Sequence, residues 1–174
     1  METWDALAAR RNVRQYRPDP IPEADLRRIV EAGWRAPSAS NRQHRDFVVV
    51  TDPGQLRRLA TVWRGAGHIA GAAAAVALVV PDADDERTRL VDQFDLGQAA
   101  YAILVAAADL GIGTGHSSVG DQDEARAILG VPAGHTISYL IGAGYPADRP
   151  LRPIARPDRR PIEEVVHHGR WRAS

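Results

Sequence analysis

The segment DQFDLGQAAYAILVAAADL, residues 92–110, limits most strongly what this chain can fold into. Its side chains are apolar on almost every side and rich in alanine, which predicts one long helix that is buried around most of its circumference. Small side chains also allow another helix to approach it closely. The rest of the chain, or a second subunit, must therefore cover this helix.

The segments around this helix are predicted to be shorter helices and strands. Apolar periodicity and proline positions predict helices at residues 3–10, between Pro22 and Pro37, after Pro53 and at residues 124–129. Continuous apolar runs predict buried strands at residues 47–50, 74–80 and 137–141. With 44% hydrophobic residues, we expect one domain over residues 1–174.

Three details complete this prediction. Trp34 is placed in the apolar stripe of the second helix, and the acidic stretch PDADDER at 81–87 is interpreted as a turn. The segment GIGTG at 111–115 is interpreted as a helix end that leads into a strand, because its spacing and position differ from the dinucleotide-binding fingerprint.

Composition excludes several function classes. The 22 basic residues, all arginine, balance 22 acidic residues, so no protein-wide field favours nucleic acid or a membrane surface. The chain has no cysteine, which fits a cytoplasmic protein and excludes a thiolate nucleophile or thiolate metal site. The longest apolar run, residues 70–80, is too short to span a bilayer, and the N-terminus does not read as a signal peptide.

Nothing in the sequence forms an acid–base, nucleophilic or metal-binding motif. The 6 histidines are scattered except for His167 and His168, which we expect to be solvated in a last helix. We therefore predict no catalytic side chain and no metal, and any enzymatic chemistry would come from a cofactor.

The stretch ARRNVRQYRPDP, residues 9–20, concentrates four arginines early in a neutral chain. A helix C-terminus accounts for Arg10 and in part Arg11, but accounts poorly for Arg14 and Arg17. A second pair, Arg159 and Arg160, lies in the tail. Arginines bind phosphate through two parallel hydrogen bonds, so two clusters on one phosphate would suit a mononucleotide; surface ion pairs with the carboxylates are the alternative.

Several stretches together resemble the nitroreductase family of FMN-dependent oxidoreductases. They are RRNVRQYRPDPIPEADLRRIVEAGWRAPSASNRQ, DLGQAAYAILVAAADLGIGTG, GDQDEARAILGVPAGHTISYLIGAGYP and RRPIEEVVHHGRW, in the order expected for the family. The resemblance implies an α+β fold with a mostly antiparallel central sheet flanked by helices. It also implies a homodimer in which the C-terminal tail is exchanged and FMN lies at the interface.

The resemblance implies the following site residues. The FMN phosphate would be held by Arg10, Arg11, Asn12 and Arg14, and the phosphate site would be closed by Arg159 and more weakly by Arg160. The second subunit would contribute Pro37, Ser38 and Asn41, with Gln43 bracing their loop. Backbone N–H groups for the flavin N5 and O4 edge would come from Ser117, Ser118 and Val119. His116 would either shape the pocket or face water. Arg17, beyond the motif, is expected on the surface.

The implied reaction takes hydride from NADH or NADPH at flavin N5 and gives it to an electron-poor acceptor such as a nitroaromatic or a quinone. Two alternatives stay open at this point. One is a flavin-cleaving enzyme similar to the 5,6-dimethylbenzimidazole synthases, and the other is a flavin-binding protein without enzymatic activity.

Overall fold

The computed structural model of the protein describes residues 1–171. Its centre is a four-stranded antiparallel sheet in the order β1-β2-β4-β3. The strands are β1 Asp46–Val50, β2 Ala74–Pro81, β3 Gly113–Ser118 and β4 His135–Gly144. With helices packed on this sheet, the predicted α+β class is confirmed; exchange of the tail between subunits stays a prediction.

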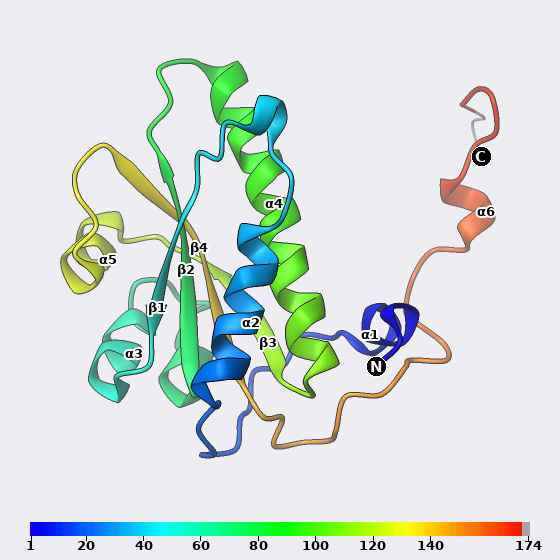
Figure 1. Ribbon diagram of the computed structural model, residues 1–174, viewed down its shortest axis with the longest axis horizontal. Helices are drawn as coiled ribbons and strands as arrows, with labels where there is room; N and C mark the ends of the chain where they lie inside the picture. The colour runs from blue at the N-terminus through cyan, green and yellow to red at the C-terminus, as the bar shows by residue number, and fades with distance from the viewer. Residues whose placement is uncertain (172–174) are drawn as a thin grey trace.

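Helices cover both faces of the sheet (Figure 1). One face carries α2 Glu23–Trp34 and α4 Glu86–Asp109, and the other carries α3 Pro53–Leu59, the 3-10 helix η2 Gly67–Gly71 and α5 Gln122–Leu129. Helix α1 Thr3–Ala9 packs against α4, η1 Ala39–Asn41 follows α2, and α6 Ile162–Val165 lies in the tail.

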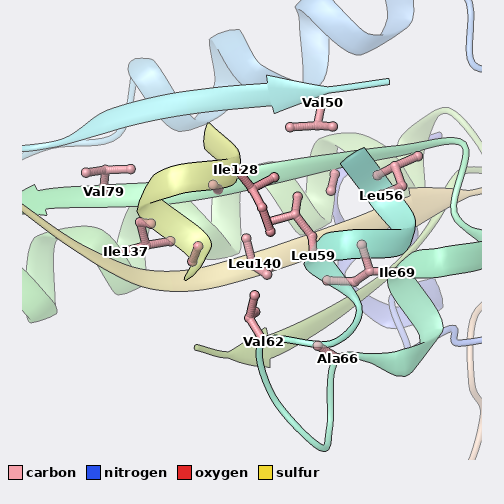
Figure 2. Packing of buried hydrophobic residues seen from close by; sticks show 13 residues of the cluster. Val50, Leu56, Leu59, Val62, Ala66, Ile69, Val79, Ile128, Ile137 and Leu140 are labelled. Carbon is pink, nitrogen blue, oxygen red and sulfur yellow. The ribbon is translucent and has the colours of Figure 1, made fainter. Parts of the chain in front are cut away.

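The core is divided by the sheet into two hydrophobic clusters. On one side, Val50, Leu59 and Leu140 meet between the strands, α3 and α5 (Figure 2). On the other side, Ile103 of α4 and Ile141 of β4 belong to the second cluster. Every residue of β2 except Pro81 is buried, which explains why this strand reads as a continuous apolar run.

Two predictions about helix boundaries need correction. Helix α4 begins at Glu86 and not at 92, because the Asp85 side chain accepts a hydrogen bond from the Thr88 N–H at 2.9 Å and caps the helix. The acidic stretch is therefore partly helical. Helix α6 ends at Val165, so His167 is not in a helix, and its ring lies 4.2 Å from that of Trp171.

The placement of Trp34 was also wrong, since its side chain is 63% exposed. Its neighbour Gly33 faces α4, and an added Cβ there would lie 2.8 Å from Ile103. Successive helical residues point about 100° apart, so a close helix contact at position 33 turns position 34 toward solvent.

The long helix α4 is only partly covered within one chain. Leu90, Phe94 and Tyr101 lie along one side of it and are 56%, 71% and 47% exposed. Within residues 1–171 none of the helices is both long and apolar enough to cross a membrane. The prediction of a helix buried on most sides therefore holds for its sheet-facing half.

Candidate functional site

The early arginine segment is attached to the open edge of β3. The Val13 N–H donates to the Thr114 carbonyl at 2.9 Å, and Asn12 pairs with Thr114 as a parallel bridge. Val13 is buried, and the Tyr16 hydroxyl donates to the carbonyl oxygens of Val13 at 2.7 Å and Gly142 at 3.2 Å. The backbone of residues 12–16 is therefore fixed against the sheet.

Two glycines of β3 make this attachment possible. A Cβ added at Gly115 would lie 2.5 Å from the Val13 carbonyl oxygen, and one at Gly113 would lie 2.6 Å from the Val13 side chain. Gly111 has a φ of +73° at the end of α4, so the predicted helix end leading into a strand is confirmed. The same glycine-rich segment also lets the arginine segment approach, a contact that no pattern in the sequence predicts.

The four arginines of the segment have different partners. Arg11 donates to the Asp148 carboxylate at 2.7 Å and to the Arg149 carbonyl at 2.8 Å, and so holds the start of the tail. Arg17 is exposed and pairs with Asp19 at 3.0 Å, as expected for a surface residue. Within residues 1–171, Arg14 forms no hydrogen bond or ion pair, and the buried Nε of Arg10 has no hydrogen-bond partner.

Arg10 is instead placed over an aromatic ring. Its guanidinium carbon lies 5.8 Å from the centroid of Tyr101 on α4. Burial raises the pKa of the Tyr16 hydroxyl above its ordinary range. The positive charge of Arg14 lowers the same pKa, but by less. Tyr16 is therefore a neutral hydrogen-bond donor, and the segment keeps the positive charges of Arg10 and Arg14 uncompensated.

A hollow of about 450 Å³ opens beside Arg11. Arg149 and Arg152 line it from the tail. The predicted tail arginines lie elsewhere: Arg159 donates to the Asp158 carbonyl at 2.6 Å, and Arg160 lies 3.4 Å from Glu164. In this single chain, neither contacts the first arginine segment.

Arg149 and Arg152 were missed, although the sequence carries a signal for them. They stand in the pattern RPLRP, at 149–153, in which prolines favour an extended backbone. Such a backbone can run past a neighbouring segment and present arginines to it. This signal was weaker than the family resemblance that pointed to positions 159 and 160.

The end of β3 supplies backbone donors. In an antiparallel pair, alternate residues of a strand direct their backbone N–H and C=O groups toward the partner strand. The Thr114 carbonyl accepts the Val13 N–H, so the backbone groups of Thr114 point away from β4. By the same alternation, those of His116 and Ser118 also point away from β4. Of the three predicted donors, Ser118 therefore has an N–H at the open edge, whereas Ser117 is paired toward Leu140. Val119 is partly buried against the core.

His116 lies on the sheet face that carries α4. Its side chain is exposed, and its ring lies edge-on to Tyr139 at a centroid distance of 6.5 Å. Both rings line a hollow of about 310 Å³ beside α4. Among the described residues, no three His, Cys, Asp or Glu side chains are grouped so that they could hold a metal ion.

The loop with Pro37, Ser38 and Asn41 lies beside the opposite end of α4 from α1 (Figure 1). The Gln43 N–H donates to the Ser38 hydroxyl oxygen at 3.0 Å, and the Gln43 side chain donates to the Asn41 carbonyl at 3.3 Å. These bonds agree with the bracing role expected of Gln43. The arginine segment and this loop do not meet within one chain.

Comparison with known proteins gives one family. A sequence profile of the nitroreductase family matches residues 7–70 and 59–145. A Thermus thermophilus protein named NADH dehydrogenase is 33% identical over 201 residues, which include 95% of this chain and 95% of that protein. A Bacillus subtilis protein named FMN reductase [NAD(P)H] is 26% identical over 187 residues, 95% of this chain and 73% of its own length.

A solved structure shows the same fold. Nitroreductase A from Vibrio parahaemolyticus superposes with a TM-score of 0.85 at 24% identity, over 97% of this chain and 76% of its own. The resemblance seen in the sequence is thereby confirmed: this chain belongs to the nitroreductase family.

Proposed function

We propose that this protein is an FMN-dependent oxidoreductase that takes hydride from NADH or NADPH and passes it to an electron-poor acceptor such as a nitroaromatic or a quinone. Membership of the nitroreductase family supports this proposal, as does the likeness to a relative named FMN reductase [NAD(P)H]. The observation that carries it is the pair of uncompensated guanidiniums, Arg10 and Arg14, on a segment fixed to β3.

The residues at the β3 edge fit FMN by their chemistry. A phosphate monoester needs charged and neutral donors, and the buried unpaired Nε of Arg10, the exposed Arg14 and the exposed Asn12 side chain supply them. The Ser118 N–H faces the same open edge as a donor for the flavin ring. When bound, FMN supplies the two-electron chemistry for which the chain has no side chain of its own.

Arg11 has a different part in this proposal. Its bonds to Asp148 and to the Arg149 carbonyl bring the tail, with Arg149 and Arg152, beside the phosphate residues. Arg159, and more weakly Arg160, would close the phosphate site once the tail is docked. The absence of cysteine suits a reducing compartment, so we assign the enzyme to the cytoplasm.

We further propose that the active unit is a homodimer with FMN at the interface. Phe94 and Tyr101 are exposed on α4, and large exposed apolar patches mark association sites. The tail also exposes Ile162 and Trp171, which are 66% and 80% accessible in one chain. A second subunit would cover these surfaces and bring its Pro37, Ser38 and Asn41 to the flavin.

The first test identifies the cofactor. Purified protein should be yellow, and chromatography after denaturation should release FMN, because the site offers arginines for one phosphate and no pyrophosphate motif. Release of FAD, or no flavin even after soaking with FMN, would contradict the proposal.

The second test identifies the reaction. Steady-state oxidation of NADH and NADPH over a panel of nitroaromatics and quinones should show turnover with at least one pair. Loss of the flavin itself, after incubation of reduced flavin with the protein under oxygen, would favour the flavin-cleaving alternative. No oxidation of either nicotinamide with any acceptor would favour a flavin-binding protein.

A further inference from the structure

The loop that follows α2 has an unusual backbone. Ser40, Asn41 and Gln43 have φ values of 52°, 54° and 58°, in the left-handed region that residues other than glycine rarely adopt. Such conformations persist only where surrounding interactions hold them, and they cluster at functional sites. The structure shows what holds this loop.

Arg45 fixes the start of the loop. Its guanidinium donates to the Pro37 carbonyl at 3.0 Å, to the Trp34 carbonyl at 3.4 Å and to the Ala36 carbonyl. These carbonyls lie at and just beyond the C-terminus of α2, where helical carbonyls lack partners. One side chain therefore joins the end of the helix to the beginning of the loop.

Two buried carboxylates of α4 fix its middle. Asp95, which is 7% exposed, accepts a hydrogen bond from the Ala39 N–H at 2.8 Å. Asp92, which is 3% exposed, accepts one from the Arg42 guanidinium at 2.9 Å. Burying a carboxylate costs free energy unless the carboxylate has a hydrogen-bond or ion-pair partner. Moving the loop would remove the partner of Asp92 or Asp95 and leave a buried charge uncompensated. Both bonds therefore resist movement of the loop.

This arrangement keeps two donors available. The Ser38 hydroxyl oxygen accepts the Gln43 N–H, which leaves its own hydrogen free to donate. The Asn41 side chain is exposed and has no hydrogen-bond partner within residues 1–171. Both belong to the residues expected at the flavin of the second subunit.

We infer that Asp92, Asp95 and Arg45 are positioning residues that preform the loop at 37–43, so that its Ser38 and Asn41 fit the flavin bound by the partner subunit. This inference rests on the proposed function. A loop fixed during folding loses no further conformational entropy when the ligand binds, so the three residues raise affinity without touching the flavin.

Asp95→Ala tests the inference. Loss of one charge-assisted bond should speed amide hydrogen exchange at Ala39 and weaken FMN binding, each by about tenfold. Asp95→Asn keeps an acceptor oxygen without the charge and should restore most of both effects. In turnover, Asp95→Ala should raise the acceptor KM more than it lowers kcat, because the loop borders the site and does no chemistry.

Asp109→Ala is the matched control. Asp109 is on the same helix and pairs with Arg28 at 2.9 Å, but it lies at the far end from the loop. We expect a similar loss of thermal stability without faster exchange at Ala39 or weaker FMN binding. If Asp95→Ala does not fold, Ala39→Pro removes the donor N–H at the first position of η1, where proline is tolerated, and should weaken FMN binding equally.

The outcomes separate the two proposals. If the parent binds FMN and Asp95→Ala binds it equally well, the carboxylate is merely structural and the inference is overturned, whatever happens to exchange at Ala39. If the parent itself binds no FMN, the proposed function fails, and the inference with it.

Discussion

The arginine segment at 10–17 and the tail at 149–160 are similarly rich in arginine, but they are attached differently: the segment is anchored by a buried residue at the sheet edge, whereas the tail is held at the surface by Arg11 and by a hydrogen bond from the Ile154 N–H to the Ala8 carbonyl. Val13 of the segment is buried and hydrogen-bonded to β3. Every tail residue from 152 to 160 is exposed. The number of arginines therefore does not decide which stretch can form a preformed anion site; the attachment of the backbone does.

The difference has a simple physical origin. The segment carries an apolar residue, Val13, and a hydrogen-bonding ring, Tyr16, opposite glycines that leave room for both. The tail carries three prolines, at 150, 153 and 157, each without an N–H for a sheet. We expect the segment to be competent in one chain, whereas the tail needs the partner subunit.

Removing the tail should have the largest effect. A chain that stops after Asp148 retains the strands and both core clusters, so circular dichroism should still show the fold. It should lose both the homodimer and bound FMN, because the apolar tail residues and Arg159 are gone. Analytical ultracentrifugation checks this, and a stable, flavin-loaded monomer would show that the tail is dispensable.

Detaching the segment should come next. Gly115→Ala puts a Cβ 2.5 Å from the Val13 carbonyl oxygen, an overpacking that typically costs about 1–3 kcal/mol. We expect a lower free energy of unfolding and FMN binding weakened by up to about a hundredfold. Gly71→Ala, where the added Cβ meets nothing within 4 Å, is the control and should leave both unchanged.

Neutralising one arginine of the segment should have a smaller, more selective effect. Arg14→Ala removes a charge-assisted bond of about 1.5–3 kcal/mol and should weaken FMN binding roughly tenfold to a hundredfold. Arg14→Lys should recover part of the loss, since lysine keeps the charge without the planar fork. Riboflavin, which lacks the phosphate, should bind the parent and Arg14→Ala alike in fluorescence titrations.

Arg17→Ala is the matched control for Arg14. Its side chain is 55% exposed and paired with Asp19, and such surface pairs contribute about 0–1 kcal/mol. Its loss should leave FMN affinity almost unchanged. If Arg17→Ala were the more damaging of the two changes, the phosphate site would lie elsewhere.

The smallest effect should be a dependence of tail attachment on pH. Hydrogen bonds from the Arg11 side chain and the Arg149 N–H hold the pKa of Asp148 below its ordinary value. The contact is therefore complete above the ordinary pKa of about 4 and is lost as the pH falls through the lower folded pKa. Pepsin should cut the tail faster at the lowest pH values, where Asp148 is protonated. Arg11→Ala should abolish this dependence of the cleavage rate on the protonation of Asp148.

The parts of the site that depend on local pattern could be predicted from the sequence. The arginine segment, the loop after α2 and the positions of the strands along the chain follow from periodicity, proline positions and family motifs. Asp92 and Asp95 could not be recognised as supports of a loop, because their pairing with Arg42 and Ala39 is set by how α4 packs. The exposure of Trp34 had the same origin, in a close contact at Gly33 that no single helix reveals.

The hydrogen bond between Val13 and Thr114 joins residues separated by most of the chain. During synthesis the arginine segment leaves the ribosome first, but it has no surface to lie on until β3 has been made and has paired with β4. Long-range contacts of this kind form late in folding. We therefore expect cofactor loading to follow the synthesis of β3 and β4, and in cells short of flavin the apo chain should accumulate with its central sheet already complete.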